Sequence, residues 1–182
     1  MKNRKIIIKF LIRFFVTYFL LLAAYSIYLK QTQQKGDVFS CDPLTEKVAN
    51  QTQKLGKILG FNTFTNQHED ELSMKFFVGD VYAARIVEGC NALSVIILFI
   101  AFVIAFSGKL KHTILFIMGG SLVIHILNIT RIALLMVAFY NFPEFNTFLH
   151  DILFPLAIYG TVFILWIIWV NKFSFYAKET AK

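Results

Sequence analysis

The chain has few charged residues and very few cysteines. Only 16% of its 182 residues are Asp, Glu, Lys or Arg, whereas about 25% is usual in water-soluble domains, and 57% are hydrophobic. This composition excludes a disordered chain and disfavours an ordinary soluble domain. The two cysteines, Cys41 and Cys90, are too few for a disulfide framework or a thiolate metal site. The hydrophobic residues are therefore expected to be buried in lipid.

Several short motifs that define enzyme classes are also missing. The sequence contains no C-x-x-C for thiol redox chemistry, no H-E-x-x-H for zinc, no G-x-S-x-G and no phosphate-binding glycine loop. We therefore expect no metal and no other cofactor. The basic residues do not form a patch interleaved with aromatic side chains, so nucleic acid is not an expected partner.

Four hydrophobic blocks predict about four transmembrane helices in an all-α membrane protein, with residues 1–182 forming one integral membrane domain. About 20 apolar residues are needed to cross the hydrocarbon core. The predicted crossings are residues 10–29, 90–106, 113–131 or 113–142, and 152–170. The first block follows a basic stretch like that of a signal peptide, but it is long and no small-residue cleavage site follows it. It is expected to be a retained anchor.

The third block is too long for one straight crossing. As a helix, its roughly 30 residues would reach about 45 Å, beyond the about 30 Å of the hydrocarbon core. Two glycines and three polar residues interrupt it: Gly119, Gly120, His125, Asn128 and Arg131. The block must tilt, protrude or break. If it breaks, a crossing ends near Arg131 and residues 132–142 lie at the interface or re-enter the membrane.

Lys and Arg residues are concentrated on one side of the predicted bundle. With four crossings, one side carries ten basic residues and one acidic residue, a net charge of +9, and the other carries eight basic and ten acidic residues, −2. Because the cytoplasmic side is enriched in Lys and Arg, both termini are expected in the cytoplasm and the chain in the cytoplasmic (inner) membrane. Residues 30–89 then form an extracytoplasmic segment. The overall charge of +7 is explained by the orientation of the chain in the membrane.

The extracytoplasmic segment contains two further predicted elements. Leu44, Val48, Leu55 and Leu59 have helical spacing within residues 43–60, which predicts an amphipathic helix on the membrane surface or across the bundle. The runs SMKFFV and VYAARIVEG flank the dipeptide Gly79-Asp80, a pattern typical of a tight β-hairpin. This small hairpin would lead directly into Cys90.

Three chemically distinct groups are expected on the outer side of the membrane: Cys90 at the start of the second crossing, Arg131 in the third segment, and His150 before the fourth. A helix N-terminus stabilises a thiolate, so Cys90 is a candidate nucleophile, and Gly89 would let another backbone approach closely. The alternatives for Cys90 are a small buried apolar residue or a disulfide with Cys41.

Arg131 and His150 are candidates for the other catalytic roles. A cation within a membrane segment usually faces a cavity or a partner, so Arg131 is a candidate to stabilise an oxyanion, with Asn128 one turn earlier to orient it. The alternative is an arginine that snorkels to the headgroups. His150 is either a general acid and base or a solvated loop residue, and His125 is a rival base. Asp151 is not assigned as an orienting carboxylate, because adjacent side chains on a helix point in different directions.

The order of these residues resembles that in a known family. Residues 85–92 (RIVEGCNA) open a hydrophobic helix, Asn128 and Arg131 belong to an N-I-T-R sequence in a later one, and His150 precedes the last block. This set resembles the exosortase/archaeosortase family, and the length and layout look most like the compact exosortase F type of Bacteroidetes. Many members of that family have glycine two residues after the cysteine, where this chain has Ala92.

The resemblance implies a membrane-embedded cysteine protease and transpeptidase. Its partners would be exported proteins with a C-terminal sorting signal, made of a short motif, a membrane helix and a basic tail, besides the lipid bilayer itself. The implied site has Cys90 as nucleophile, His150 as acid and base, Arg131 for the oxyanion or substrate, and Asn128, Gly89 and Asn91 in support. The alternative function is a non-catalytic membrane chaperone or assembly factor, because the roughly 60-residue outer segment is large for a minimal bundle.

Overall fold

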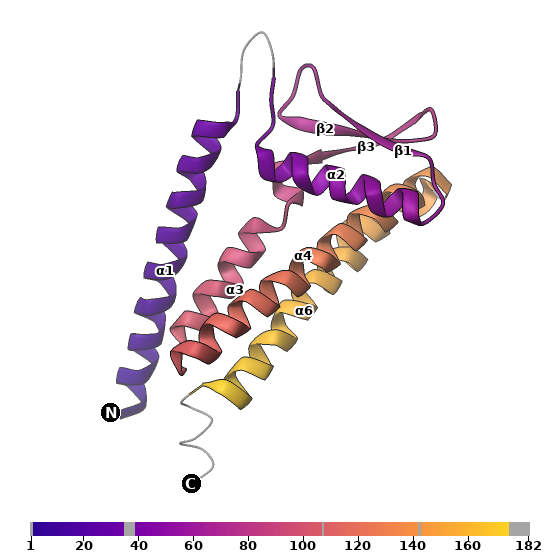
Figure 1. Cartoon of the computed structure of the whole chain (residues 1–182). Coiled ribbons are helices and arrows are strands. Elements are labelled where there is room, and N and C mark those ends of the chain that lie inside the picture. Colours follow the sequence, from indigo (N-terminus) through magenta and orange to yellow (C-terminus); the bar gives the residue numbers. More distant parts are fainter. Residues whose placement is uncertain (1, 35–38, 107, 142, 175–182) are drawn as a thin grey trace. The chain divides into compact units, whose positions relative to one another are not determined.

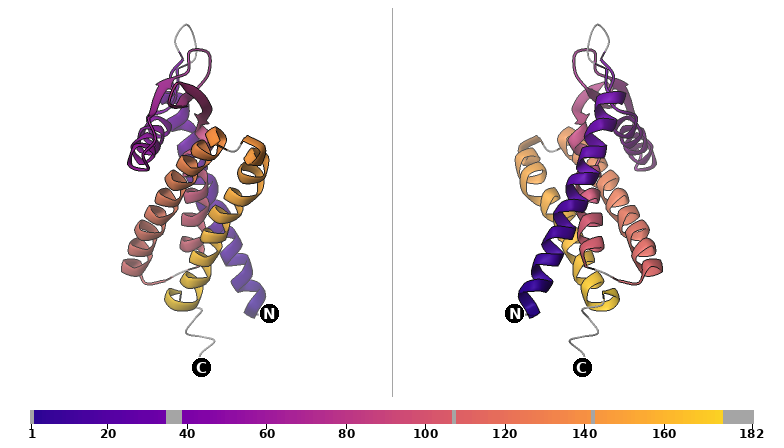
Figure 2. Two further views of the ribbon diagram at one scale, coloured as in Figure 1. Left: turned by 90° about the vertical axis from the view of Figure 1, so that its right-hand side faces the viewer. Right: turned by 90° about the vertical axis from the view of Figure 1, so that its left-hand side faces the viewer.

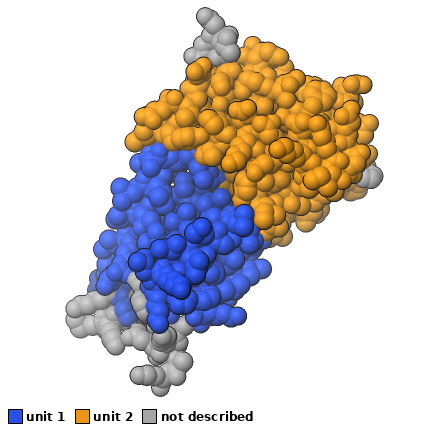
Figure 3. All heavy atoms as spheres, in the orientation of Figure 1, with its two compact units in different colours: residues 1–26, 93–124, 159–182 blue, residues 27–92, 125–158 orange. Residues whose placement is uncertain are grey.

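The computed structural model is mostly helical and describes residues 2–34, 39–106, 108–141 and 143–174 (Figure 1). The main helices are α1 (Lys2–Thr32), α2 (Pro43–Ile58), α3 (Leu93–Ala105), α4 (Leu110–Asn141) and α6 (Phe154–Ile168), and the strands are β1 (Thr63–Gln67), β2 (Ser73–Val78) and β3 (Val81–Val87). The shorter elements are η1 (Glu88–Cys90), η2 (Pro143–Phe145), α5 (Asn146–Phe148), η3 (Leu149–Leu153) and η4 (Trp169–Phe173). The chain divides into two compact units, coloured in Figure 3: unit 1 is residues 1–26, 93–124 and 159–182, and unit 2 is residues 27–92 and 125–158.

Three helical segments are long and apolar enough to cross a membrane: Ile6–Thr32, Leu110–Asn141 and Leu149–Phe173. The remaining predicted crossing, residues 90–106, forms only the 13-residue helix α3, which at about 1.5 Å per residue is roughly 20 Å long. The structure therefore supports a helical membrane protein with three candidate spans in its described residues. It does not establish the fourth.

The third hydrophobic block forms one unbroken helix. α4 runs from Leu110 to Asn141, 32 residues, so the block does not break near Arg131, and where along this helix a crossing ends stays a prediction. Gly119 and Gly120 lie inside this helix, where glycine is tolerated at a cost of about 1 kcal/mol relative to alanine.

The helix of the second predicted crossing was expected to begin at Cys90, and this helix start is wrong. Cys90 ends the short 3-10 turn η1, and helix α3 begins three residues later at Leu93. Ala92 separates the two because its φ of 61° lies in the left-handed region, which an α-helix cannot include. The thiol therefore does not lie at the N-terminus of α3, and the predicted stabilisation by that helix does not apply.

Ala92→Val is expected to lower the free energy of unfolding by about 2 kcal/mol, because a β-branched side chain is strongly disfavoured at positive φ. Ala92→Gly is the matched control and is expected to change stability by less than about 0.5 kcal/mol, since the relief of backbone strain offsets the loss of the methyl group. Denaturant titration in detergent measures the free energy of unfolding of both variants. Equal stability of the Val and Gly variants would contradict the left-handed conformation.

Unit 2 contains a three-stranded antiparallel sheet with the order β1-β2-β3. The predicted hairpin is confirmed: β2 and β3 pair around Gly79-Asp80, with Val78 opposite Val81, and Gly79 has the positive φ of 59° that such a turn requires. β1, which pairs with β2 from Thr63 opposite Val78 to Gln67 opposite Met74, was not predicted.

The predicted amphipathic helix is confirmed as α2. Asp42 caps its N-terminus by accepting hydrogen bonds from the backbone N–H groups of Leu44 (3.1 Å) and Thr45 (2.9 Å), and Pro43 is the first helical residue. Of the predicted stripe Val48 is buried, and the rest of the buried face consists of small and polar residues: Thr45, Ala49, Thr52 and Gly56. Leu44 and Leu59 are exposed.

The core of unit 2 lies between α2, the sheet and the second half of α4. Its buried cluster combines residues of the α2 region, strands β2 and β3, and α4: Cys41, Val48, Ala49, Met74, Phe76, Val78, Ile86, Ile132 and Met136. This packing fixes α4 against the sheet at Ile132, the neighbour of Arg131. The candidate site is thus built around a rigid core.

Unit 1 is a bundle of helical segments (Figures 1 and 2), and aromatic side chains pack between them. Phe102 of α3 stacks on Trp166 of α6 with ring centroids 4.1 Å apart, and Phe10 of α1 lies 4.4 Å from Phe106. Trp169 is fully buried and donates its indole N–H to the Phe106 carbonyl at 2.9 Å. A buried indole needs such a partner, so this bond fixes how the C-terminal helix packs within the unit.

Candidate functional site

Cys90 lies in unit 2, in a turn that follows strand β3 directly. It is the last residue of η1, is half-buried, and packs against the buried core cluster of that unit. Both cysteines are free thiols, so the predicted alternative of a Cys41–Cys90 disulfide is not present in this structure. Cys90 is thus a partly exposed residue in a turn that directly follows a strand.

A buried asparagine on α4 holds the Cys90 backbone. The Asn128 side chain is only 2% exposed, and its Nδ2 donates to the carbonyl oxygen of Cys90 at 2.7 Å. Asn128 was expected to orient Arg131, but the structure gives its amide this different partner. The bond pairs the amide of the buried Asn128, which needs a partner, and it connects the thiol-bearing turn to α4.

A second buried asparagine, Asn91, joins the turn to helix α2. Nδ2 of Asn91 donates to Oγ1 of Thr45 at 3.2 Å, and this hydroxyl donates to Oδ2 of Asp42 at 2.7 Å. All three residues are buried, and networks of this kind are strong in a low-dielectric interior. Sequence reasoning missed Asp42 and Thr45, although Asp-Pro at the start of an apolar-periodic segment is a helix-start signal.

Thr45→Val is expected to lower the free energy of unfolding by about 1–2 kcal/mol, because it removes the hydroxyl that accepts from Asn91 and donates to the buried Asp42 carboxylate. Thr52→Val is the matched control. The Thr52 hydroxyl is buried in the same helix and has no hydrogen-bond partner within the described residues, so its loss is expected to be neutral or stabilising. Chemical denaturation of the purified variants measures both free energies of unfolding. Equal losses in Thr45→Val and Thr52→Val would contradict a structural role for the network of Asn91, Thr45 and Asp42.

Arg131 lies one helical turn after Asn128 on α4. The side chain is half-buried, and its Nε is a buried donor without a hydrogen-bond partner in the part of the chain that the structure describes. Buried donors in native proteins are almost always paired, so an exception needs an explanation. A substrate oxygen is one partner that would satisfy this donor.

His150 lies in the π-helical turn η3, before α6. Its Nδ1 is 2.7 Å from Oδ1 of Asp151, and both side chains are well exposed. Asp151 was not assigned as the orienting carboxylate, yet in this turn it lies within hydrogen-bonding distance of the ring. Among the described residues, no hydrogen bond joins His150 to Cys90 or to Arg131, so the structure does not by itself bring the predicted base to the thiol.

The other two predicted residues have different surroundings from those expected. Nε2 of His125, the rival base, lies 3.0 Å from Oε1 of Gln51 on α2, so it links two helices of unit 2. Gly89 is exposed, and a methyl group built on it would meet no heavy atom within 4 Å. The close backbone approach predicted at Gly89 is therefore wrong.

Cys41 differs sharply from Cys90. Burial, reinforced by the carboxylates of Asp42 and Glu46, raises the pKa of the Cys41 thiol from 9.0 to about 11. Because the pKa is higher in the folded state, the associated stabilisation is complete below pH 9 and is lost as the pH rises through about 11. A thiol of this kind is a poor nucleophile at neutral pH.

At pH 8 iodoacetamide is therefore expected to modify Cys90 in the folded protein and to modify Cys41 only after denaturation. Peptide mapping by mass spectrometry measures the two rates separately. Modification of Cys41 in the folded state at a rate similar to that of Cys90 would contradict its burial, which leaves only 4% of the residue exposed.

No group of three or more His, Cys, Asp and Glu side chains within residues 2–34, 39–106, 108–141 and 143–174 is arranged to hold a metal ion. The site consists instead of one half-buried thiol, two buried amides and one partly buried guanidinium. No protein-family profile, curated protein or solved structure matches this chain.

Proposed function

We propose that this chain is a membrane-embedded cysteine peptidase and transpeptidase that cleaves C-terminal sorting signals of exported proteins. One observation carries the proposal: the 2.7 Å hydrogen bond from Asn128 to the Cys90 carbonyl. It holds the thiol-bearing turn against the part of α4 that presents Arg131 one turn later. A nucleophile and a cation on elements joined in this way supply two of the groups that acyl transfer uses.

The proposed reaction forms and then breaks a thioester. His150 takes the proton of the Cys90 thiol, the thiolate attacks the scissile carbonyl, and Arg131 stabilises the oxyanion. His150 then gives the proton to the leaving amine as the C–N bond breaks, and water or an acceptor amine releases the acyl group. Asp151 at Nδ1 would leave Nε2 of His150 to carry this proton. Because His150 is not bonded to Cys90 in the described residues, substrate binding would have to bring it to the thiol.

The proposed topology has four crossings, with α3 extended by its flanking residues as the second. Both termini lie in the cytoplasm and Cys90 faces outward, in the cytoplasmic membrane. The charge distribution of +9 against −2 supports this orientation. A secreted protein's membrane-proximal motif would then arrive on the side of the thiol.

The test follows processing of a co-expressed exported protein that ends in a short motif, a membrane helix and a basic tail. Cys90→Ala is expected to abolish processing, whereas Cys41→Ala, the control with the other free thiol removed, is expected to retain it. Immunoblots of enzyme and substrate give both expression level and extent of processing. Normal processing by the Cys90→Ala variant would exclude the proposed nucleophile.

A second candidate is a non-catalytic chaperone or assembly factor for exported proteins. It is favoured by the apolar side chains that the sheet exposes, such as Val81 (52% exposed) and Tyr82 (47% exposed), beside the stacked rings of Phe64 and Phe77. A thiol-reactive peptide probe separates the two functions. Labelling of Cys90 that is lost in Arg131→Ala or His150→Ala supports the peptidase, and an inert thiol supports the chaperone.

A further inference from the structure

Strand β3 is an edge of the sheet in unit 2, and the chain runs from it directly to the candidate nucleophile. The strand order is β1-β2-β3, so β3 pairs with β2 on one side only. It ends at Val87, and the turn that follows it ends at Cys90 (Figure 1). Within the described residues, no backbone hydrogen bond joins residues 81–86 to anything but β2. Because every second residue of such a strand directs its N–H and C=O groups away from its partner, β3 presents a row of unpaired backbone groups.

The two edge strands of this sheet differ in their surroundings. β1 is joined to α2, because Oγ1 of Thr63 donates to the carbonyl oxygen of Gln53 at 2.8 Å. On β3, Val81 and Tyr82 are 52% and 47% exposed. Proteins usually block an exposed edge with charges or cover it, because it would otherwise pair with another chain. Arg85 is the one charged residue among the seven of β3, and it already forms an ion pair. β3 is therefore the edge that is open to an incoming strand.

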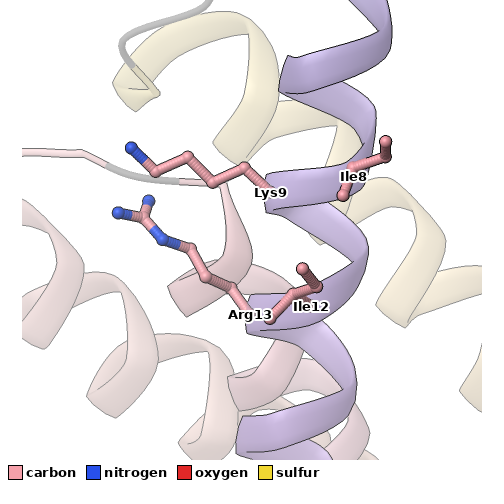
Figure 4. Close-up of a pocket in the computed structure, with 4 residues that line it drawn as sticks. All are labelled: Ile8, Lys9, Ile12 and Arg13. Atoms are coloured by element: carbon pink, nitrogen blue, oxygen red, sulfur yellow. The ribbon is translucent and has the colours of Figure 1, made fainter.

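An unpaired strand edge binds an extended polypeptide, whose own backbone groups continue the hydrogen-bond ladder. The proposed substrate offers such a segment in the short motif before its membrane helix. Two hollows in unit 1 have a different character: one is lined by Ile8, Lys9, Ile12 and Arg13 of α1 (Figure 4), and the other by side chains of α3, α6 and η4. Neither is lined by a residue of unit 2, which contains Cys90.

The direction of the bound segment follows from the order of the substrate's parts. Residues after the scissile bond lead into a membrane helix, whose backbone groups are bonded within the helix, so the residues before this bond are the ones available to pair. They run toward the carbonyl that Cys90 attacks, and β3 also runs toward Cys90. The two strands would therefore be parallel. At about 3.3 Å per residue, the seven residues of β3 give an edge roughly 20 Å long, enough for a short motif.

We propose that the substrate segment before the scissile bond binds as a fourth strand, parallel to β3 and along its free edge. This inference rests on the proposed function and adds the surface that holds the substrate. Backbone pairing supplies affinity for any extended segment, and the side chains that alternate along β3 supply selectivity. The exposed Tyr82 lies near the start of the strand and Val87 at its end, so these two residues mark the register of the bound segment.

Disulfide crosslinking in membranes tests this binding mode without requiring cleavage. The enzyme carries Cys41→Ala and Cys90→Ala, which remove both of its thiols, together with either Tyr82→Cys or Val87→Cys. The co-expressed substrate carries one cysteine, moved in turn through the residues before its membrane helix. Neighbouring strands lie about 4.8 Å apart, within reach of a disulfide. Parallel pairing predicts that Val87→Cys crosslinks next to the scissile bond and that Tyr82→Cys crosslinks about five residues earlier in the substrate.

The matched control is Asn66→Cys in the same background, because Asn66 is an exposed residue of the other edge strand, β1. It is expected to give at least about tenfold less crosslinked product than either β3 variant. Equal yields from the two edges would overturn the proposal. So would the reverse order of crosslinks, which indicates antiparallel pairing, and crosslinks spread along the substrate without order, which indicate binding of a client without register.

The result for strand pairing can be separated from the result for the proposed function. If processing requires Cys90 but neither β3 variant crosslinks, the peptidase remains supported and strand pairing is rejected. If Cys90→Ala processes the substrate normally, the catalytic role of Cys90 is rejected, and ordered crosslinks would still locate an extended segment on β3. Immunoblots compare the amounts of the variants. If Tyr82→Cys does not accumulate, Val81→Cys replaces it at the same end of the strand, and absence of its crosslink rejects the site.

Discussion

In the proposed peptidase reaction, replacing Arg131 by Gln is expected to lower the rate of substrate cleavage about 100- to 1000-fold, which is the usual cost of removing one group that stabilises an oxyanion. The half-buried position of Arg131 strengthens its interaction with a developing charge relative to water. Arg131→Lys keeps the charge but loses the planar fork of donors, so an intermediate loss is expected. The unaltered protein and the two variants are compared by their initial rates of substrate processing in isolated membranes, normalised to the amount of enzyme.

The control for this experiment is Arg85→Gln. Arg85 is an exposed arginine of strand β3 in the same unit, where its Nη1 lies 2.5 Å from Oε2 of Glu71, and exposed pairs of this kind contribute little to stability. Cleavage is expected to change less than twofold. Similar losses in the Arg85 and Arg131 variants would indicate that the net charge of the unit matters, and not a catalytic role for Arg131.

Stability separates a catalytic role for Arg131 from a structural one. Its Nε has no hydrogen-bond partner within the described residues, so Arg131→Gln removes no bond made by this atom. The denaturation midpoint is therefore expected to remain near that of the unaltered protein. A large loss of stability alongside the loss of rate would favour a structural explanation.

Much of the fold was predictable from hydropathy and from residues that favour turns, because both depend only on residues close together in the sequence. The hairpin of β2 and β3 was predicted from Gly79-Asp80 and its flanking apolar runs, and α2 from helical spacing after Pro43. β1 was missed because its sequence, TFTNQ, contains one large apolar residue and becomes a strand only by pairing with β2. α4 remains continuous through its two glycines because tertiary packing on both units outweighs their low helix propensity.

The site was less predictable because its geometry depends on contacts between distant residues. The hydrogen bond from Asn128 to Cys90 joins residues 38 positions apart, and that from Asn91 to Thr45 joins residues 46 positions apart. Neither bond could be predicted from periodicity in the sequence. The start of α3 was misplaced because alanine rarely adopts the positive φ found at Ala92. The sequence identified residues whose side chains suit acyl transfer. The structure identified which of them lie on connected elements, Cys90 and Arg131, through the hydrogen bond of Asn128.

The largest effect on stability is expected from Gly120→Val, in unit 1. A Cβ atom at Gly120 would lie 2.3 Å from Cζ of Phe99, far inside van der Waals contact, and the Phe99 ring is fully buried. Because the ring cannot move into solvent, the helices must separate or the ring must leave its preferred rotamer. Overpacking of this kind costs about 3 kcal/mol. Denaturant titration in detergent measures the loss.

The neighbouring glycine provides the control for Gly120→Val. A Cβ at Gly119 meets no heavy atom within 4 Å, so Gly119→Val introduces the same side chain into the same helix without a clash and is expected to change stability by less than about 1 kcal/mol. In a Phe99→Ala background, which removes the obstructing ring, Gly120→Val is expected to lose most of its effect, with a coupling energy of about 2 kcal/mol. Equal losses at the two glycines, or no coupling to Phe99, would contradict the close packing of α3 against α4 in unit 1.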